Sequence, residues 1–127
     1  MFVKTVTVFC SYIDKGETKY ARRIIKGVFI DKSKVVNTNT TGMTDVDRIF
    51  IGIPESRVPT YKTPKEFAKD VENSLTFKEG DKIAEGEIQT DYTSMINLEK
   101  EHDNIYTITG VDFKDFGSMP HFEISGK

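Results

Sequence analysis

Short runs of β-branched and aromatic residues alternate with turn residues through the C-terminal third of the chain, and this pattern constrains the fold most strongly. Gly tolerates positive φ angles and Asp bonds its own backbone, so both mark tight turns. Ile, Tyr, Thr and Val suit a pleated, half-buried sheet surface. The pattern therefore predicts a strand-turn-strand unit, a helical connection and two returning strands. The strand segments are residues 82–84, 87–88, 104–111 and 121–125, and the first two turns are at residues 78–81 and 85–86.

Three more strands are predicted in the N-terminal part of the chain. The opening strand alternates polar and apolar residues, although Phe9 interrupts the alternation. The second, residues 20–30, changes its apolar phase on the two sides of Gly27, which predicts a bulge or a sharp bend there. The third, residues 48–53, is apolar on one face. The residues of the apolar faces are Phe2, Val6, Val8 and Cys10 in the first strand and Ile49, Ile51 and Ile53 in the third.

Three segments are predicted to be irregular. Residues 31–47 are dominated by Asn, Thr, Ser and Asp, with only a short candidate strand at Val35 and Val36, and this composition predicts an exposed loop. Residues 54–64 contain three spaced prolines. Because proline lacks the N–H that a sheet ladder needs, that segment should be extended but lie outside the sheet centre. Residues 112–120 are predicted to form a third loop.

Two short helices complete the prediction. Thr63 and Glu66 have the spacing of a capping box, with Pro64 at the first helical position, which predicts a helix of about two to three turns. Residues 92–101 carry a partial apolar stripe and predict the second helix. Five to seven short strands with one or two small helices indicate a mainly β protein of one domain, residues 1–127. The expected architecture is a small antiparallel β-barrel or a sandwich.

The composition excludes several classes of protein. The 18 basic and 20 acidic side chains are interspersed and leave a formal net charge of −2, which does not make the field that a polyanion binder needs. Apolar runs are too interrupted for a membrane span, and residues 1–6 lack the apolar core of a signal peptide, so we expect neither. Cys10 is the single cysteine, which excludes a disulfide framework and indicates a small buried hydrophobe.

No arrangement of residues in the sequence indicates catalysis. A glycine-rich phosphate loop, a G-x-S-x-G elbow and an H-E-x-x-H helix are all lacking from the sequence. His102 lies in a charged turn whose neighbouring residues point in different directions, and His121 falls on the solvent face of the last strand. Two carboxylates flanking a cleft could hydrolyse glycosides, but turns are ordinarily acidic, so we expect no enzyme, cofactor or metal. The acidic residues around the strand-turn-strand unit are Glu79, Asp81, Glu85, Glu87 and Asp91.

A small β-barrel that binds DNA is an alternative reading of the same sequence. Arg22, Arg23 and Lys26 lie near Tyr20 and Phe29, a combination found on barrels that bind oligonucleotides. Consecutive residues of a strand point to opposite faces of the sheet, however, so Arg22 and Arg23 do not share one surface. A basic edge in an acidic protein commonly protects the sheet from unwanted pairing.

Taken together, the pattern resembles the small head–tail connector (joining or adaptor) proteins of tailed bacteriophages. It is also similar to a family of phage minor capsid proteins. The strands and turns that carry the resemblance are residues 25–28, 49–54, 78–83, 85–86, 103–111 and 121–124. These segments are spread over most of the chain and include no catalytic motif.

The resemblance implies a non-enzymatic virion protein of the neck, present in the host cytoplasm during assembly. Such a protein forms a homo-oligomeric ring, sixfold or twelvefold, beneath the portal. The ring seals the head, with portal or adaptor proteins above it and tail proteins below, and can contact DNA non-specifically in the channel. It needs no membrane and no cofactor. A tail terminator or another tail-tube component is the alternative within the same class.

Long loops of this family reach the neighbouring subunit or line the channel, which the resemblance extends to two segments here. They are residues 34–47 and 54–64, chosen by composition and length. The loop at residues 112–120 could add apolar contacts at a ring interface. The candidate contact residues are Asn37, Thr40, Gly42 and Met43 in the first segment, Arg57, Val58 and Tyr61 in the second, and Phe113 and Phe116 in the third.

Overall fold

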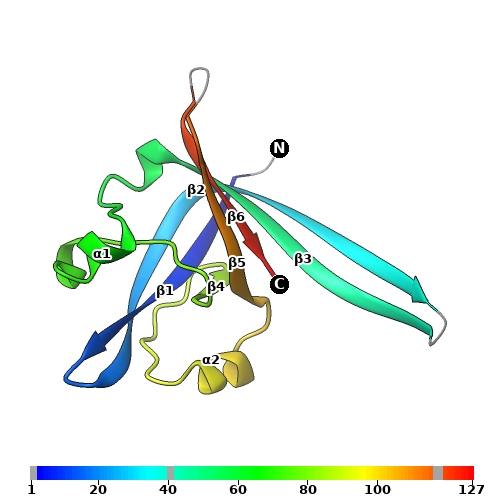
Figure 1. Ribbon diagram of the computed structural model, residues 1–127, viewed down its shortest axis with the longest axis horizontal. Coiled ribbons are helices and arrows are strands. Elements are labelled where there is room, and N and C mark those ends of the chain that lie inside the picture. Colours follow the sequence, from blue (N-terminus) through cyan, green and yellow to red (C-terminus); the bar gives the residue numbers. More distant parts are fainter. Residues whose placement is uncertain (1–2, 40–41, 116–118) are drawn as a thin grey trace.

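Six antiparallel strands close into a barrel in the computed structural model, which describes residues 3–39, 42–115 and 119–127 (Figure 1). The order around the barrel is β1-β2-β3-β6-β5-β4, and β4 pairs with β1 to close it. The predicted mainly β class is therefore confirmed, and the architecture is a barrel rather than a sandwich. The strands are β1 (Lys4–Asp14), β2 (Glu17–Asn39), β3 (Gly42–Pro54), β4 (Lys82–Glu85), β5 (Ile105–Lys114) and β6 (His121–Gly126).

The barrel interior is filled by alternate residues of the strands. The predicted apolar faces of β1 and β3 both point inward, because burial on one face is what produces the alternation. Their inner residues are at most 2% exposed. Phe2 lies outside the described residues. The inner residues of these two strands are Val6, Val8, Cys10, Ile49, Ile51 and Ile53.

Phe9 interrupts the alternation of β1 because the barrel wall is covered on its outer side at this point. Its ring is fully buried in a second apolar cluster with Ala84, Ile88 and Leu98. Leu98 comes from α2 (Met95–Glu101), which lies beside the barrel (Figure 1). The helix begins later than the predicted residue 92 because Ser94 is its N-cap and accepts a hydrogen bond from the Asn97 N–H.

The predicted bulge at Gly27 is confirmed. Lys4 pairs with Val28 and Thr5 pairs with Lys26, so Gly27 is the extra residue of β2. Its φ angle is +83°, a conformation that favours glycine. The Arg57 side chain covers this position, and a Cβ atom at Gly27 would lie 2.5 Å from Arg57 Nε.

Residues 31–47 are not a loop, as their composition predicted, but belong to a long hairpin of β2 and β3. The two strands pair continuously from Phe29 with Gly52 to Asn39 with Gly42. Beyond the barrel, residues 33–39 pair only with residues 42–48 in the described part of the chain, and we call residues 33–39 and 42–47 of this ribbon the arm (Figure 1). The ribbon pairs outside the barrel and its sequence lacks the apolar alternation of a strand with one face in a core, while its Thr and Val residues still favour a strand.

The crossover from β3 to β4 is built from single turns. It contains η1 (Glu55–Arg57), α1 (Pro64–Phe67) and η2 (Val71–Asn73). The Thr63 hydroxyl caps α1 by accepting from the Glu66 N–H, as the spacing predicted. The helix is shorter than predicted because the chain turns away after Phe67, and the Ser74 hydroxyl donates to the carbonyl of Asp70.

Residues 54–64 leave the sheet at Pro54, in agreement with the prediction, but they contain the 3-10 turn η1 and are not extended throughout.

Two other expectations for the C-terminal third were wrong. Residues 87–88 do not form a strand, because the chain bends at Gly86 and is held by a side chain. The Thr7 hydroxyl donates to the Gly86 carbonyl over 2.8 Å and accepts from the Ile88 N–H over 2.9 Å. The expected loop at residues 112–120 begins later, because β5 runs to Lys114 and pairs with β6 as far as His121.

Candidate functional site

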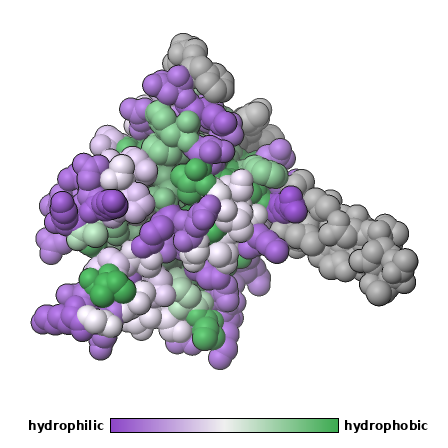
Figure 2. Space-filling view, viewed as in Figure 1, coloured by the Kyte–Doolittle hydropathy of each residue, from purple (hydrophilic) through white to green (hydrophobic). Residues whose placement is uncertain are grey.

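Two adjoining hollows lie on the surface where η1 meets the hairpin of β5 and β6. The first has a volume of about 820 Å³ and the second about 980 Å³. They share Pro54 and Met119, so we treat them as one apolar groove. Figure 2 shows apolar residues gathered near this hairpin. The first hollow is lined by Pro54, Glu55, Ser56, Val58, Pro59, Tyr61, Phe113, Met119, Pro120 and Phe122, and the second by Phe29, Ile30, Asp31, Phe50, Ile51, Gly52, Pro54, Met119, His121 and Glu123.

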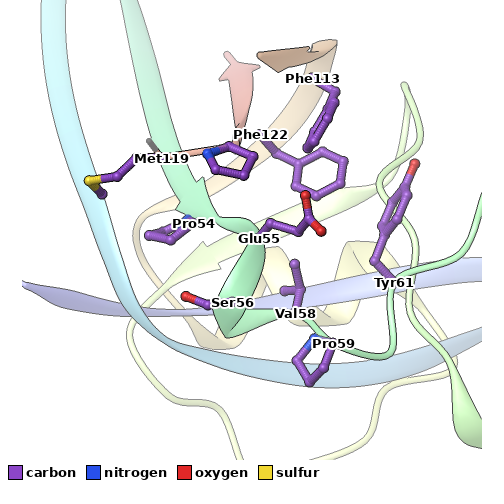
Figure 3. A pocket seen from close by; sticks show the side chains of 10 residues that line it. Pro54, Glu55, Ser56, Val58, Pro59, Tyr61, Phe113, Met119 and Phe122 are labelled. Carbon is purple, nitrogen blue, oxygen red and sulfur yellow. The ribbon is translucent and has the colours of Figure 1, made fainter. Parts of the chain in front are cut away.

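A cluster of aromatic rings forms the floor of the first hollow (Figure 3). Phe122, which is 4% exposed, is the central ring, with Tyr61 at 4.4 Å and Phe113 at 4.9 Å between ring centroids. Phe77 lies beneath, 5.2 Å from Phe122 and 5.6 Å from Tyr61. Burial raises the pKa of the Tyr61 phenol, so this ring stays neutral. Each of these rings thus packs against at least one other ring.

The backbone fixes the walls of the groove. The Glu55 N–H donates to the Pro120 carbonyl over 3.0 Å and joins η1 to the start of β6. Tyr61 is held from both sides, because its N–H donates to the Val58 carbonyl and the residue forms a bridge with Leu75. Pro54 and Pro59 have no backbone N–H group, so neither adds a donor that would need a partner in the groove.

Large apolar side chains of the groove remain exposed to water. Phe113 is 44% exposed, Phe50 45% and Met119 59%. Single exposed apolar residues are common on protein surfaces, but a contiguous set marks a contact surface. Nothing in the described part of the chain covers these three side chains.

The charged residues that line the groove are acidic, apart from one histidine. Glu55 points into the first hollow, toward Tyr61 and Phe122 (Figure 3). Asp31 and Glu123 line the second hollow. His121 Nε2 lies 3.2 Å from the Glu123 carboxylate and Nδ1 lies 3.0 Å from the Met119 carbonyl. The Met119 carbonyl and then Glu123 raise the pKa of His121 above its usual value.

Comparison with known proteins places the chain in one family. A family model described as "Family of unknown function (DUF6751)" matches residues 1–127. The chain belongs to this family. No curated protein and no solved structure matches it.

The structure brings three of the predicted contact residues together. Val58, Tyr61 and Phe113 all line the first hollow, although they come from separate segments of the sequence. Arg57 points away to cover Gly27 instead. Asn37, Gly42 and Met43 belong to the arm, whose side chains are outside the description, and Thr40 and Phe116 lie outside the described residues altogether.

Other members of the groove were not predicted as contacts. Phe122 was expected only as an apolar strand residue, and Glu55 only as part of a proline-rich segment. The three spaced prolines were the signal that this segment runs along the surface. The second hollow has no such signal. Phe50 and Glu123, which line it, are outward residues of ordinary strands.

The acidic residues that suggested a possible catalytic pair do not converge. Glu85 pairs with Lys32 at 2.5 Å, Glu87 with Lys26 at 3.9 Å, and Asp91 with Arg22 at 2.9 Å. Asp81 is buried and accepts hydrogen bonds from Ser11. The carboxylates are thus tied to separate partners and do not share one site.

The single cysteine, Cys10, is buried in the barrel core. Burial raises the pKa of the Cys10 thiol to about 11, so the thiolate nucleophile is scarce at neutral pH. Among the described residues, no group of three or more His, Cys, Asp or Glu side chains could hold a metal ion. None of the helices in that part of the chain is long and apolar enough to cross a membrane.

Arg22 and Arg23 point to opposite sides of the barrel wall and are both occupied by contacts within the protein. Arg22 bonds the Asp91 carboxylate and the Ile88 carbonyl. Arg23 donates to the carbonyls of Ser74 and Val71 in the crossover. Both guanidinium groups fasten connecting segments to β2, so they do not form a common basic face for a nucleic acid.

Proposed function

We propose that this protein is a non-enzymatic structural protein of the neck of a tailed bacteriophage, where it forms a homo-oligomeric ring below the portal. The observation that supports an assembly role best is the arm, residues 33–39 and 42–47, which extends from the closed barrel (Figure 1). The sequence resemblance to head–tail connector proteins supplies the identity of the assembly.

The arm is a costly feature for a protein that acts alone. A two-stranded ribbon without a third strand is marginally stable in water. Its outer edges carry backbone groups that can pair with another chain, and proteins usually blunt or cover such edges. The barrel itself has no free sheet edge over its closed part, because all six strands pair around it. An arm of this kind is useful where a neighbouring subunit or partner covers it.

The described chemistry of the barrel agrees with this proposal. An enzyme would need a concave site where titratable groups converge. In the described residues, Glu85, Glu87 and Asp91 pair with separate basic residues, the cysteine is buried, and the groove is lined mainly by apolar side chains. These features suit contact with other proteins: portal or adaptor proteins on one side of the ring and tail proteins on the other.

Electron microscopy of particles from a lysogen with a stop codon at Tyr12 tests the proposal. We expect detached heads beside complete free tails, and empty heads in addition if the ring seals the DNA. Heads bearing tails of aberrant length would move the protein to the tail terminator instead. Intact, infectious particles would overturn the proposal.

A further inference from the structure

The charged side chains that line the apolar groove are mainly acidic. Its charged lining consists of Asp31, Glu55 and Glu123, all exposed, together with the paired His121. No Lys or Arg is found among the described lining residues of either hollow. Elsewhere the acidic side chains commonly have basic neighbours, as in the pairs of Lys19 with Asp14, Arg22 with Asp91, Lys62 with Asp70 and Lys82 with Glu99.

We propose that this groove docks an extended segment of a partner protein that carries aliphatic or proline side chains together with Lys or Arg. The exposed rings of Phe113 and Phe50 and the Met119 side chain offer apolar contact along the groove. The aromatic floor is already packed, so the contact requires little reordering. Flat rings and prolines of this kind accept the side chains of an extended chain.

The carboxylates define which segment fits. Glu55 extends over the aromatic floor of the first hollow (Figure 3), and Glu123 and Asp31 lie along the second. A partner with Lys or Arg beside its apolar residues places a cation near these carboxylates. An acidic partner would be repelled at the same positions, so charge selects the partner while apolar contact holds it.

This inference extends the proposed function by naming the chemistry of one partner, but it rests on the groove and not on the arm. Peptide docking can therefore fail while the neck assignment holds. It can also succeed in a protein that is found outside the phage neck.

Two pools of synthetic heptapeptides test the proposal on the purified full-length protein. One pool is randomised over Val, Ile, Leu, Phe, Pro and Lys, and the other has Glu in place of Lys. The immobilised protein should retain the Lys pool about fivefold more than the Glu pool, the ratio expected from one or two exposed ion pairs. Equal retention of the two pools, or retention of neither, would overturn the proposal.

Matched variants separate docking in the groove from general attraction to an acidic protein. Removing the groove charges by Asp31→Asn, Glu55→Gln and Glu123→Gln together should abolish the preference for Lys. The control variant loses the same charge at exposed positions away from the groove, by Glu17→Gln, Glu72→Gln and Asp103→Asn. It should keep the preference for the Lys pool. If both variants lose the preference equally, the groove carboxylates do not determine the preference for Lys.

A second pair of variants tests the apolar contact in the groove. Phe113→Ala should remove most of the retention of the Lys pool, whereas Ile13→Ala, at a residue that is 71% exposed and not part of the groove, should leave it unchanged. Circular dichroism confirms that each variant is folded. If a second copy of the protein occupies the groove instead, wild-type retention falls as the protein concentration rises, and that result overturns docking of a separate partner.

Discussion

At the scale of single residues, the buried Asp81 carboxylate takes the hydrogen bonds of a β1 residue that no neighbouring strand reaches. β4 pairs with β1 only from Val6 to Phe9. Ser11 lies further along the same edge of β1 and has no strand partner on that side. The Asp81 carboxylate accepts hydrogen bonds from the Ser11 N–H at 3.1 Å and from the Ser11 hydroxyl at 2.5 Å. The Lys78 ammonium donates to the Ser11 carbonyl over 2.9 Å. Side chains therefore take the place of a neighbouring strand.

This arrangement predicts a defined pH dependence. Burial raises the pKa of Asp81 above its ordinary value of 3.8, more than the Ser11 hydrogen bonds lower it. The folded state thus binds the proton more tightly than the unfolded state. The stability that protonated Asp81 contributes is lost as the pH rises from about 3.8 through the raised pKa. Asp81→Asn removes this loss and keeps an acceptor for the Ser11 N–H. Its melting temperature relative to wild type should rise across that pH range.

Thermal unfolding followed by circular dichroism at several pH values measures this difference. Asp81→Ala is the contrasting variant, because it leaves the half-buried Ser11 N–H without its acceptor and should destabilise the protein by about 1–3 kcal/mol. A difference between Asp81→Asn and wild type that is constant with pH would contradict the prediction.

Gly27 and Arg57 give a second prediction at this scale. Gly27→Ala forces a side chain into a backbone with φ of +83° and against Arg57, so we expect a loss of about 1–2 kcal/mol from the backbone alone. Adding Arg57→Ala removes the steric contact but not the backbone strain, and should restore only part of the stability. Urea unfolding of the two single variants and the double variant measures this. Full recovery would show that the contact dominates.

At the scale of elements, α2 stabilises the barrel from outside through one side chain. Leu98 is fully buried against Phe9 and Ile88, whereas Ile96 on the same helix is 66% exposed. Leu98→Ala should lower the free energy of unfolding by about 2–5 kcal/mol. Ile96→Ala, the matched control, should change it by less than about 0.5 kcal/mol. Equal effects in urea unfolding would mean that α2 does not cover the barrel through this face.

The elements also show how far sequence reasoning extends. Strands with one face in the core, such as residues 48–53, were predicted because burial leaves a period of two in the sequence. The arm was missed because it lies beyond the strand pairings that form the barrel and its sequence carries no such period. The groove was found only in part: Val58, Tyr61 and Phe113 were candidates, but the pairing of β5 with β6 and the bond from Glu55 to Pro120 decide that they meet.

At the scale of the whole molecule, the closed barrel and the arm are separable units. Every pairing that closes the barrel uses residues outside 33–47. Folding of the barrel should therefore not depend on the arm, while assembly should. The separation allows the proposed role to be tested without destroying the fold.

The decisive variant replaces residues 37–44 with Asn-Gly, a pair that forms a two-residue hairpin turn between Val36 and Asp45, which face each other in the ladder. Its melting temperature should match wild type, because all the strand pairings that close the barrel are kept. In a lysogen that carries only this variant, we expect detached heads and free tails by electron microscopy. A second variant, with residues 37–44 replaced one for one by Gly and Ser, keeps the chain length but weakens the ribbon, and should fail in the same way. Normal particles from the shortened variant would show that the arm is dispensable, and the assembly role would then have to rest on the groove.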